Sequence, residues 1–206
     1  LDTPPSIDGK LQDWDALSIH LDNPSYGAVN WQGPADQSAR STVAWDEKYL
    51  YFAAQVDDDV HVQRQHGVNI FKGDSLELVL DVDLVGDFNS SALSQDDYQV
   101  GLSPGDLKDT SVTADAFMWY PQAKSRSLPE VVLGVDLYRD TGFQIEAAIP
   151  WSVFGIEPVQ GMAFGFVLSS NDNDDPHTPK QHTMLSTVSS RLLADPTTWG
   201  TLVLDN

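Results

Sequence analysis

The stretch Tyr49-Leu50-Tyr51-Phe52-Ala53-Ala54-Gln55-Val56 decides the fold class of this sequence. In an extended chain every second residue falls on the same face, and one face would carry Leu50, Phe52, Ala54 and Val56. Apolar residues that repeat with a period of two are typical of a β-strand with one face on a hydrophobic core. Asp46-Glu47-Lys48 lies just before the stretch and has the composition of a turn.

The same alternation recurs outward from this stretch in both directions. It is clear at residues 75–83, 143–149 and 164–168, and further strands are expected at residues 97–103, 111–118, 130–138, 181–187 and 199–204. Single helical turns are expected at residues 11–17 and 150–155, and the polar stretches 22–40 and 84–97 are expected to be loops. About ten strands with minimal helix predict an all-β fold, a single antiparallel β-sandwich of jelly-roll type with two sheets packed face to face.

The composition fits one domain that spans residues 1–206. Hydrophobic residues make up 41% of the chain and aromatic residues 10%, which is enough for a core and argues against a disordered chain despite the acidity. A chain of this length buries roughly 70% of the surface that it would expose when unfolded. No internal repeat and no linker divides it, so we expect one folding unit.

The charge of the chain excludes several classes of partner. There are 31 Asp and Glu residues against 11 Lys and Arg, which gives a formal net charge of −20. Nucleic acid and anionic membrane surfaces repel such a chain, and no stretch reaches the roughly 20 apolar residues that span a bilayer. The absence of Cys excludes disulfides, zinc–thiolate sites, iron–sulfur clusters and cysteine nucleophiles. We therefore expect no nucleic-acid partner and no membrane insertion of this domain.

Six short motifs follow one another along the chain: Ile7-Asp8-Gly9-Lys10 with Asp13-Trp14, Val43-Ala44-Trp45-Asp46 with Tyr49-Leu50-Tyr51-Phe52, Gly73-Asp74-Ser75-Leu76-Glu77-Leu78, Asp96-Asp97-Tyr98-Gln99, Glu146-Ala147-Ala148-Ile149-Pro150-Trp151 and Trp199-Gly200-Thr201-Leu202. In this order they resemble the family 9 carbohydrate-binding modules and their relatives among the DOMON-like β-sandwiches. The resemblance covers nearly the whole chain.

The resemblance implies a non-catalytic module, extracellular or periplasmic, that stacks a saccharide on loop aromatics and often holds structural calcium. The ligand would be a mono- or oligosaccharide, with plant or algal polysaccharide as one source. Because the chain begins at Leu1 rather than Met, we expect either a processed chain or a module that is part of a larger polypeptide. The alternative is a ligand-sensing or interaction ectodomain of a larger receptor, which would keep the fold without the sugar clamp.

Sugar binding needs flat aromatic faces for the C–H groups of the ring and planar polar groups for its hydroxyls. The candidates are a strand glutamate, four residues of the loop before it and three other loop aromatics, namely Glu77, Arg64, His66, Phe71, Lys72, Trp31, Trp119 and Tyr120. The structural alternative is that the loop aromatics pack on the sandwich and that Glu77 forms a salt bridge on a solvated sheet face. The other four tryptophans are expected in the core: Trp14, Trp45, Trp151 and Trp199.

The resemblance also assigns individual positions. Members of the family grip a sugar end between two tryptophans, and this chain has Phe71 at the position of the first and Leu193 at the position of the second. The arginine of that clamp corresponds to Gly101, whereas Glu77 matches the family pattern. The fold is therefore expected to be retained with an altered binding site.

A calcium ion requires six to eight oxygen ligands from carboxylates, amides and carbonyls. The candidate ligands are acidic residues at the ends of predicted strands, namely Asp57, Asp58, Asp81, Asp83, Asp87 and Asp96, with residues 171–175 as a further acidic stretch. The alternative interpretation is a set of solvated acidic faces, which acidic runs usually form.

Two further hypotheses follow from individual side chains. Glu77 with Asp81 or Glu146 would supply the two carboxylates of a glycosidase, but the chain lacks the common catalytic motifs, so we expect no enzyme. A haem iron would need paired ligands, and the candidates for these are Met118, Met184 and His182.

Overall fold

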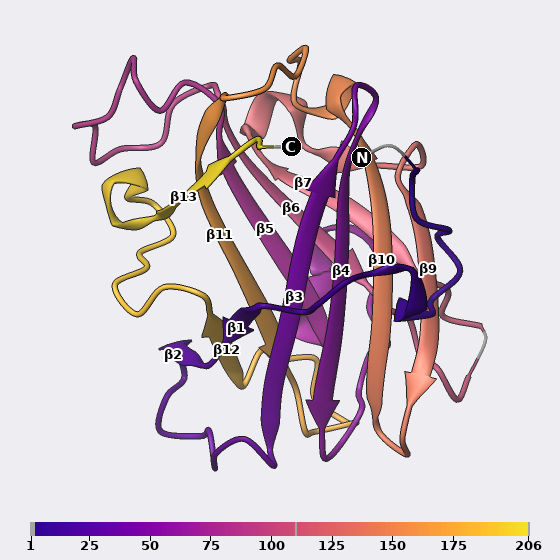
Figure 1. Cartoon of the computed structure of the whole chain (residues 1–206). Helices are drawn as coiled ribbons and strands as arrows, with labels where there is room; N and C mark the ends of the chain where they lie inside the picture. Colours follow the sequence, from indigo (N-terminus) through magenta and orange to yellow (C-terminus); the bar gives the residue numbers. More distant parts are fainter. Residues whose placement is uncertain (1–2, 110, 206) are drawn as a thin grey trace.

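The hairpin expected around Asp46-Glu47-Lys48 forms the centre of one sheet. It consists of β3 (Gln37–Trp45) and β4 (Tyr49–Asp58), which pair along their whole length. The structure is a computed structural model, and it describes residues 3–109 and 111–205. In these residues thirteen strands form two sheets in which every pairing is antiparallel (Figure 1).

Sheet A has five strands in the order β1, β3, β4, β10 and β9. Its other members are β1 (Ile19–Leu21), β9 (Val132–Tyr138) and β10 (Gly142–Pro150). Sheet B has the order β2, β12, β11, β5, β6, β7 and β8, and β13 pairs with β11. The strands of sheet B are β2 (Asn23–Tyr26), β5 (Ser75–Asp81), β6 (Asp97–Ser103), β7 (Asp115–Tyr120), β8 (Arg126–Ser127), β11 (Ala163–Asp172), β12 (Thr183–Ser186) and β13 (Gly200–Val203).

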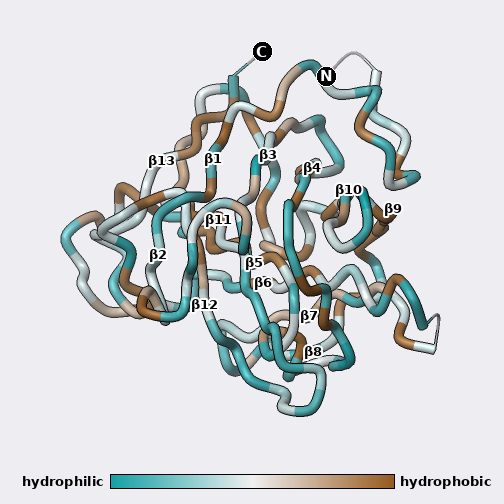
Figure 2. Tube along the Cα trace, turned by 90° about the horizontal axis from the view of Figure 1, so that it is seen from below, coloured by the Kyte–Doolittle hydropathy of each residue, from teal (hydrophilic) through white to brown (hydrophobic). Residues whose placement is uncertain are grey.

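The hydrophobic core lies between the two sheets, as the alternation predicts. The inward residues of β4 and β5 are all buried in it, namely Leu50, Phe52, Ala54, Val56, Leu76, Leu78 and Leu80. Figure 2 shows hydrophobic segments in the strands at the centre of the molecule and hydrophilic loops around them. The prediction of an all-β sandwich is confirmed.

In the residues that the structure describes, helical structure is restricted to short 3-10 turns. These are η1 (Leu11–Asp13), η2 (Gly67–Lys72), η3 (Gln122–Lys124), η4 (Trp151–Val153) and η5 (Pro196–Thr198). Within residues 3–109 and 111–205, none of them has the length and apolar character that a membrane-crossing helix requires.

The N-terminal segment of residues 6–14, here called the N-terminal strap, crosses the outer face of sheet A (Figure 1). Glu146 of β10 points out of the core and is nevertheless fully buried, because the N-terminal strap covers it. The carboxylate accepts hydrogen bonds from the backbone N–H groups of Asp8 and Gly9 at 2.9 and 2.6 Å and from the Trp14 indole N–H at 2.7 Å. These three bonds satisfy the hydrogen-bonding needs of the buried carboxylate. They explain why Asp8-Gly9 and Trp14 occur in the same chain as a glutamate that is distant in sequence.

Gly9 lets the N-terminal strap approach the sheet. Its φ of +85° lies in the left-handed region, and a Cβ there would come within 2.5 Å of the Val135 carbonyl carbon. A glycine at this position is therefore required by conformation and by space.

The polar stretch 22–40 differs from the expectation of a loop. It contains β2, and β3 begins at Gln37. The β2 sequence Asn-Pro-Ser-Tyr has little strand character, but β2 is an edge strand, where the missing N–H of Pro24 breaks no ladder. The edge position is a tertiary property that local composition does not indicate.

Candidate functional site

The outer face of sheet B places Glu77 in one row with residues of three neighbouring strands. Glu77 pairs with Ser169 on β11 and with Gly101 on β6, and Gly101 pairs with Phe117 on β7. Directly paired residues on one face lie about 4.5–5.5 Å apart at Cβ, so this row forms a continuous floor. The neighbours of Glu77 on both sides, Ser169 and Gly101, are small residues.

Trp119 covers Gly101 because β7 contains a β-bulge. Val100 pairs with Met118 and Gln99 pairs with Tyr120, so Trp119 is the extra residue of the bulge. A Cβ on Gly101 would lie 2.2 Å from Cη2 of Trp119, so only glycine leaves room for the indole. Gly101, the position that corresponds to the clamp arginine, is therefore covered by the Trp119 ring.

Three aromatic rings gather on this face, and we call Phe71, Phe117 and Trp119 the aromatic platform. The Trp119 centroid lies 6.1 Å from that of Phe71, at an interplanar angle of 81°, and 6.1 Å from that of Phe117, at 54°. The indole N–H donates to the Val68 carbonyl at 2.9 Å, which ties β7 to η2. All three rings are partly exposed, so the platform offers apolar surface to a ligand.

Glu77 is buried in an ion pair. Its carboxylate accepts from the guanidinium of Arg191, which lies in the segment after β12, and the two side chains are 3% and 4% exposed. Arg191 also contacts the Met184 sulfur at 3.0 Å. Sequence reasoning missed Arg191. The available signal was that a glutamate in the middle of a buried strand requires a cation, but no local feature marks which one.

Two polar groups beside this ion pair have no hydrogen-bond partner. They are the buried Arg191 Nε and the buried Ser169 Oγ, and Ser169 neighbours Glu77 across the sheet. Leu192 and Leu193 follow Arg191 and are 59% and 42% exposed. The position that corresponds to the second clamp tryptophan therefore presents an aliphatic side chain.

Lys72 and Arg64 lie beside the aromatic platform. The Lys72 ammonium is 5.7 Å from the Phe71 ring centroid. Both residues line a pocket of about 170 Å³ together with Asn173 and His177. Arg64 donates to the Pro176 carbonyl at 3.0 Å. Cationic donors next to an aromatic surface suit a hydroxyl-rich ligand.

The remaining predicted ligand residues have different positions. His66 is exposed at the start of η2, and Tyr120 follows Trp119 at the end of β7. Trp31 packs against the hydrophobic core and donates to the Gln37 carbonyl at 2.9 Å. Of the four tryptophans expected in the core, Trp151 is fully within it, Trp45 packs against it, and Trp14 and Trp199 are half-buried elsewhere.

Acidic residues cluster where β5 ends, and we call Asp81, Asp87, Asp96 and Asp97 the Asp81 cluster. Oxygens of the first three lie within 4.8 Å of one another. Burial, followed by the charge of Asp87, raises the pKa of Asp81 to about 7. Burial is also the largest cause of the raised pKa of Asp97, about 6. Four buried oxygens have no hydrogen-bond partner: both of Asp87, Oδ2 of Asp96 and Oδ1 of Asp97.

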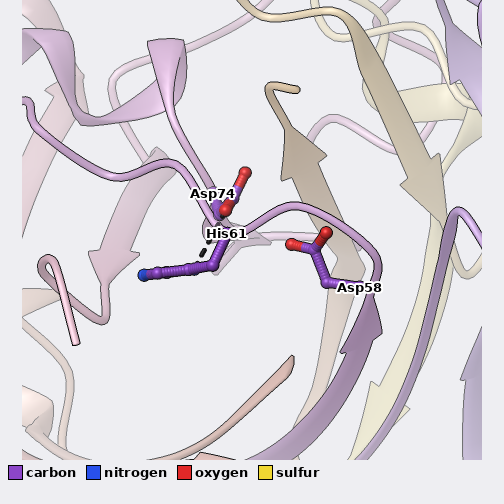
Figure 3. Close-up of side chains that lie close together, drawn as sticks. All are labelled: Asp58, His61 and Asp74. Atoms are coloured by element: carbon purple, nitrogen blue, oxygen red, sulfur yellow. Dashed lines mark ion pairs between the residues drawn. The ribbon is translucent and has the colours of Figure 1, made fainter. Parts of the chain in front are cut away.

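A second cluster lies at the start of β5, and we call Asp58, His61, Asp74, Asp172 and Asp174 the Asp58 cluster. Figure 3 shows the first three of these residues. Burial, then Asp74, raises the pKa of Asp58 to about 9, and burial, then Asp172, raises that of Asp74 well above its ordinary range. Burial, then Asp174, raises the pKa of Asp172 to about 8. The two clusters are separated by the length of β5, about 20 Å.

Two of the predicted metal ligands lie outside both clusters. Asp57 pairs with Arg139 at 2.7 Å, and Asp83 is an exposed turn residue that accepts from Gly86 N–H at 3.1 Å. Asp58, Asp81, Asp87 and Asp96 lie in the clusters, together with Asp172 and Asp174 of the acidic stretch 171–175 and with Asp97. Asp74 is the aspartate of these clusters that was not predicted as a ligand.

The carboxylate pairs considered for catalysis are not formed. Glu77 and Asp81 are four residues apart on one strand, about 13 Å, which exceeds the separation of roughly 5–9.5 Å in glycosidases. Glu146 lies on the outer face of the other sheet, beneath the N-terminal strap.

The three side chains considered as haem ligands do not form a common site in the described residues. Met118 is buried in the core and Met184 contacts Arg191, whereas His182 Nδ1 accepts from Asp174 N–H at 3.1 Å. Met118 is thus separated from Met184 by sheet B, because Met184 contacts Arg191 on the outer face.

Comparison with known proteins gives a family match over nearly the whole chain. Residues 7–206 match the family described as carbohydrate family 9 binding domain-like. Among curated proteins, the chain is 28% identical over 175 residues to an exoglucanase, XynX, from Acetivibrio thermocellus. It is 27% identical over 175 residues to an endo-1,4-beta-xylanase A from Thermoanaerobacterium saccharolyticum. Each alignment covers 83% of this chain but only 14% and 13% of the relative, so the chain spans about a seventh of their length.

Solved structures share the fold at low sequence identity. A family 9 carbohydrate-binding module from Caldicellulosiruptor kristjanssonii in complex with cellotriose has a TM-score of 0.67 at 18% identity, with 98% of this chain and 90% of that chain covered. Its complex with glucose has a TM-score of 0.66 at 19% identity, with 98% and 92% covered.

Proposed function

This chain belongs to the carbohydrate family 9 binding domain-like family, and on that premise we propose that it binds a saccharide on the outer face of sheet B. It is a carbohydrate-binding module, not a catalytic domain. The observation that carries the proposed site is the aromatic platform, in which Trp119 and Phe71 lie edge to face beside Glu77 and Arg191. Such a surface provides stacking and polar groups side by side.

The ligand class that we propose is a β-1,4-linked oligosaccharide of glucose or xylose. Support comes from the similar structures, which are complexes with cellotriose and glucose, and from the relatives named exoglucanase and endo-1,4-beta-xylanase. The sugar ring would stack on Phe71 and Trp119, and Lys72 and Arg64 would donate to its hydroxyls. Glu77 acts as a positioning residue in this arrangement because its carboxylate is already paired with Arg191.

Phe71→Ala is expected to weaken the binding of cellotriose about tenfold or more, because one face of the platform is removed. The melting temperature should stay nearly unchanged, since Phe71 is partly exposed at the end of η2. Isothermal titration with glucose, cellotriose and a xylo-oligosaccharide measures the first effect, and calorimetry measures the second.

Tyr26→Ala is the matched control for this experiment. Tyr26 is 51% exposed on β2, at the edge of sheet B opposite to β7 and β8, so its loss should leave binding unchanged. Equal affinities of the wild type and Phe71→Ala would place the sugar elsewhere. A large loss of stability in Phe71→Ala would assign Phe71 to the structure. A wild type that binds none of the sugars would favour the sensor alternative.

Calcium is the cation that we propose for the Asp81 cluster. The donors are all oxygens, as calcium requires, and four of them are buried without a partner. The side chains that would hold the ion are those of Asp81, Asp87, Asp96 and Asp97. Bound calcium would neutralise these carboxylates and fix the loop between β5 and β6, so its role would be structural.

The proposed setting is an extracellular polypeptide that is longer than this chain. The two curated relatives are about seven times longer than the matched region and are named as polysaccharide-degrading enzymes. A module that holds a polysaccharide would keep an attached catalytic domain near its substrate, because linked binding raises the effective concentration.

A further inference from the structure

The Asp58 cluster differs from the Asp81 cluster because it contains a histidine. His61 lies between β4 and β5, and its ring stacks edge to face on Phe143 of the core, with centroids 5.8 Å apart. Ligand atoms of Asp58, His61 and Asp74 lie within 4.8 Å of one another. Figure 3 shows the Asp58 carboxylate directed toward His61 and Asp74.

The hydrogen bond of Nε2 fixes the state of the His61 ring. Nε2 is 3.0 Å from the Gly105 carbonyl oxygen, which only accepts, so Nε2 carries the hydrogen. In the neutral ring Nδ1 then presents a lone pair. This lone pair faces Asp74 Oδ2 at 3.0 Å, and that oxygen already accepts from Val62 N–H at 2.6 Å. Two acceptors at this distance repel each other unless a proton or a metal ion lies between them.

Burial makes the need for a cation stronger. The side chains of His61 and Asp74 are each 1% exposed, and Asp58 is 8% exposed. His61 Nδ1 and Asp58 Oδ2 are buried and have no hydrogen-bond partner. Two aspartate side chains are buried in this space, and buried carboxyl groups are normally hydrogen-bonded, protonated or bound to a metal.

We propose that Asp58, His61 and Asp74 bind one divalent transition-metal ion, with Zn²⁺ as the representative, through His61 Nδ1 and one oxygen of each aspartate. One imidazole nitrogen and two carboxylate oxygens form a donor set typical of zinc or its first-row neighbours. The outer contacts also fit, because a ligating histidine usually donates its other N–H to a backbone carbonyl, as His61 does to Gly105. Asp74 Oδ1 is held by Asn173 N–H at 3.0 Å.

This site is separate in chemistry from the proposed calcium site. The Asp81 cluster offers only oxygens, which favour calcium, whereas a nitrogen donor favours zinc over calcium. Asp58 also lies near Asp172 and Asp174, a set of oxygens alone. An ion that bound to that set would not depend on His61, so a histidine variant separates the two arrangements. The inference does not rest on the saccharide proposal.

The test is a metal measurement on protein refolded with both cations, because a buried site fills as the chain folds. The protein is unfolded in chelator, refolded with Zn²⁺ and Ca²⁺, desalted and measured by mass spectrometry for metal per chain. We expect one Zn²⁺ in the wild type and none in His61→Gln. The control His20→Gln removes an exposed histidine on β1 and should keep the ion.

A second measurement on the wild type does not depend on the folding of a variant. The ¹⁵N spectrum of the histidine rings distinguishes a free, a protonated and a metal-bound Nδ1. We expect the His61 Nδ1 resonance to move when Zn²⁺ is present during refolding, while Nε2 keeps its hydrogen. Zn²⁺ retention by His61→Gln, no retention by the wild type, or a hydrogen on Nδ1 of the zinc-refolded protein would overturn the proposal.

Discussion

Glu146→Ala is expected to lower the free energy of unfolding by about 4 kcal/mol, because three N–H donors lose a charged acceptor and each such bond contributes roughly 1.5–3 kcal/mol. The donors are Asp8 N–H, Gly9 N–H and the Trp14 indole N–H, at 2.6–2.9 Å from the carboxylate. The expected loss is smaller than the sum of three such bonds because water replaces part of the lost bonds. The melting temperature should fall by about 10 °C, given roughly 2–4 °C per kcal/mol for a chain of this size.

Urea unfolding followed by tryptophan fluorescence measures this loss. The control is Glu130→Ala, which removes a glutamate of the same size from an exposed pair with Arg126 and should cost less than about 1 kcal/mol. Glu146→Gln should fall between the two, because one amide oxygen still accepts while the NH₂ group faces a donor. A cost below about 1 kcal/mol for Glu146→Ala would show that the N-terminal strap is held by other contacts.

Removal of calcium is expected to lower the melting temperature by about 5–10 °C. An ion that binds only the folded state stabilises it by about 2.7 kcal/mol at a hundredfold excess over its dissociation constant, and each kcal/mol shifts the transition by roughly 2–4 °C. Calorimetry in excess calcium and in excess chelator measures the difference. Asp87→Asn should abolish it, because Asp87 contributes two unpartnered oxygens. Asp140→Asn, in the exposed turn between β9 and β10, removes the same charge and should retain it.

The pH dependence of stability should differ between the calcium-free and the calcium-bound protein. Without calcium the folded-state pKa of Asp81 is about 7, above its ordinary 3.8, and that of Asp97 is about 6. The folded state then binds more protons than the unfolded state, so stability falls as the pH rises from about 4 to about 7. With calcium bound, protons compete with the ion, so the rise in melting temperature that calcium gives should shrink as the pH drops through the same range. Melting curves at about pH 5 and pH 7, with and without calcium, test this prediction. An equal effect of calcium at both pH values would contradict calcium binding by these carboxylates.

The fold and the family were determined by local patterns in the sequence. Alternation in residues 49–56 and 75–81 predicts strands because the two faces of a strand depend only on residue parity. Some residues of the motifs that resemble the family have long-range partners, as Gly9 has in Glu146. The order of the motifs along the chain was nevertheless sufficient to recognise the family. A loop was wrongly predicted for β2, because an edge strand is defined by the sheet beside it and not by its own composition.

The chemistry of the binding face was decided by the tertiary structure. Arg191 pairs with Glu77, which is 114 residues away in the sequence. Trp119 packs on Gly101 because the pairing of β6 and β7 contains a bulge. The acidic clusters likewise combine strand ends that are far apart in sequence, such as Asp58, Asp74 and Asp172. A strand's own pattern specifies which face a residue takes. Which residues from other strands stand beside it depends on strand order and register, and these are set by packing of the whole core.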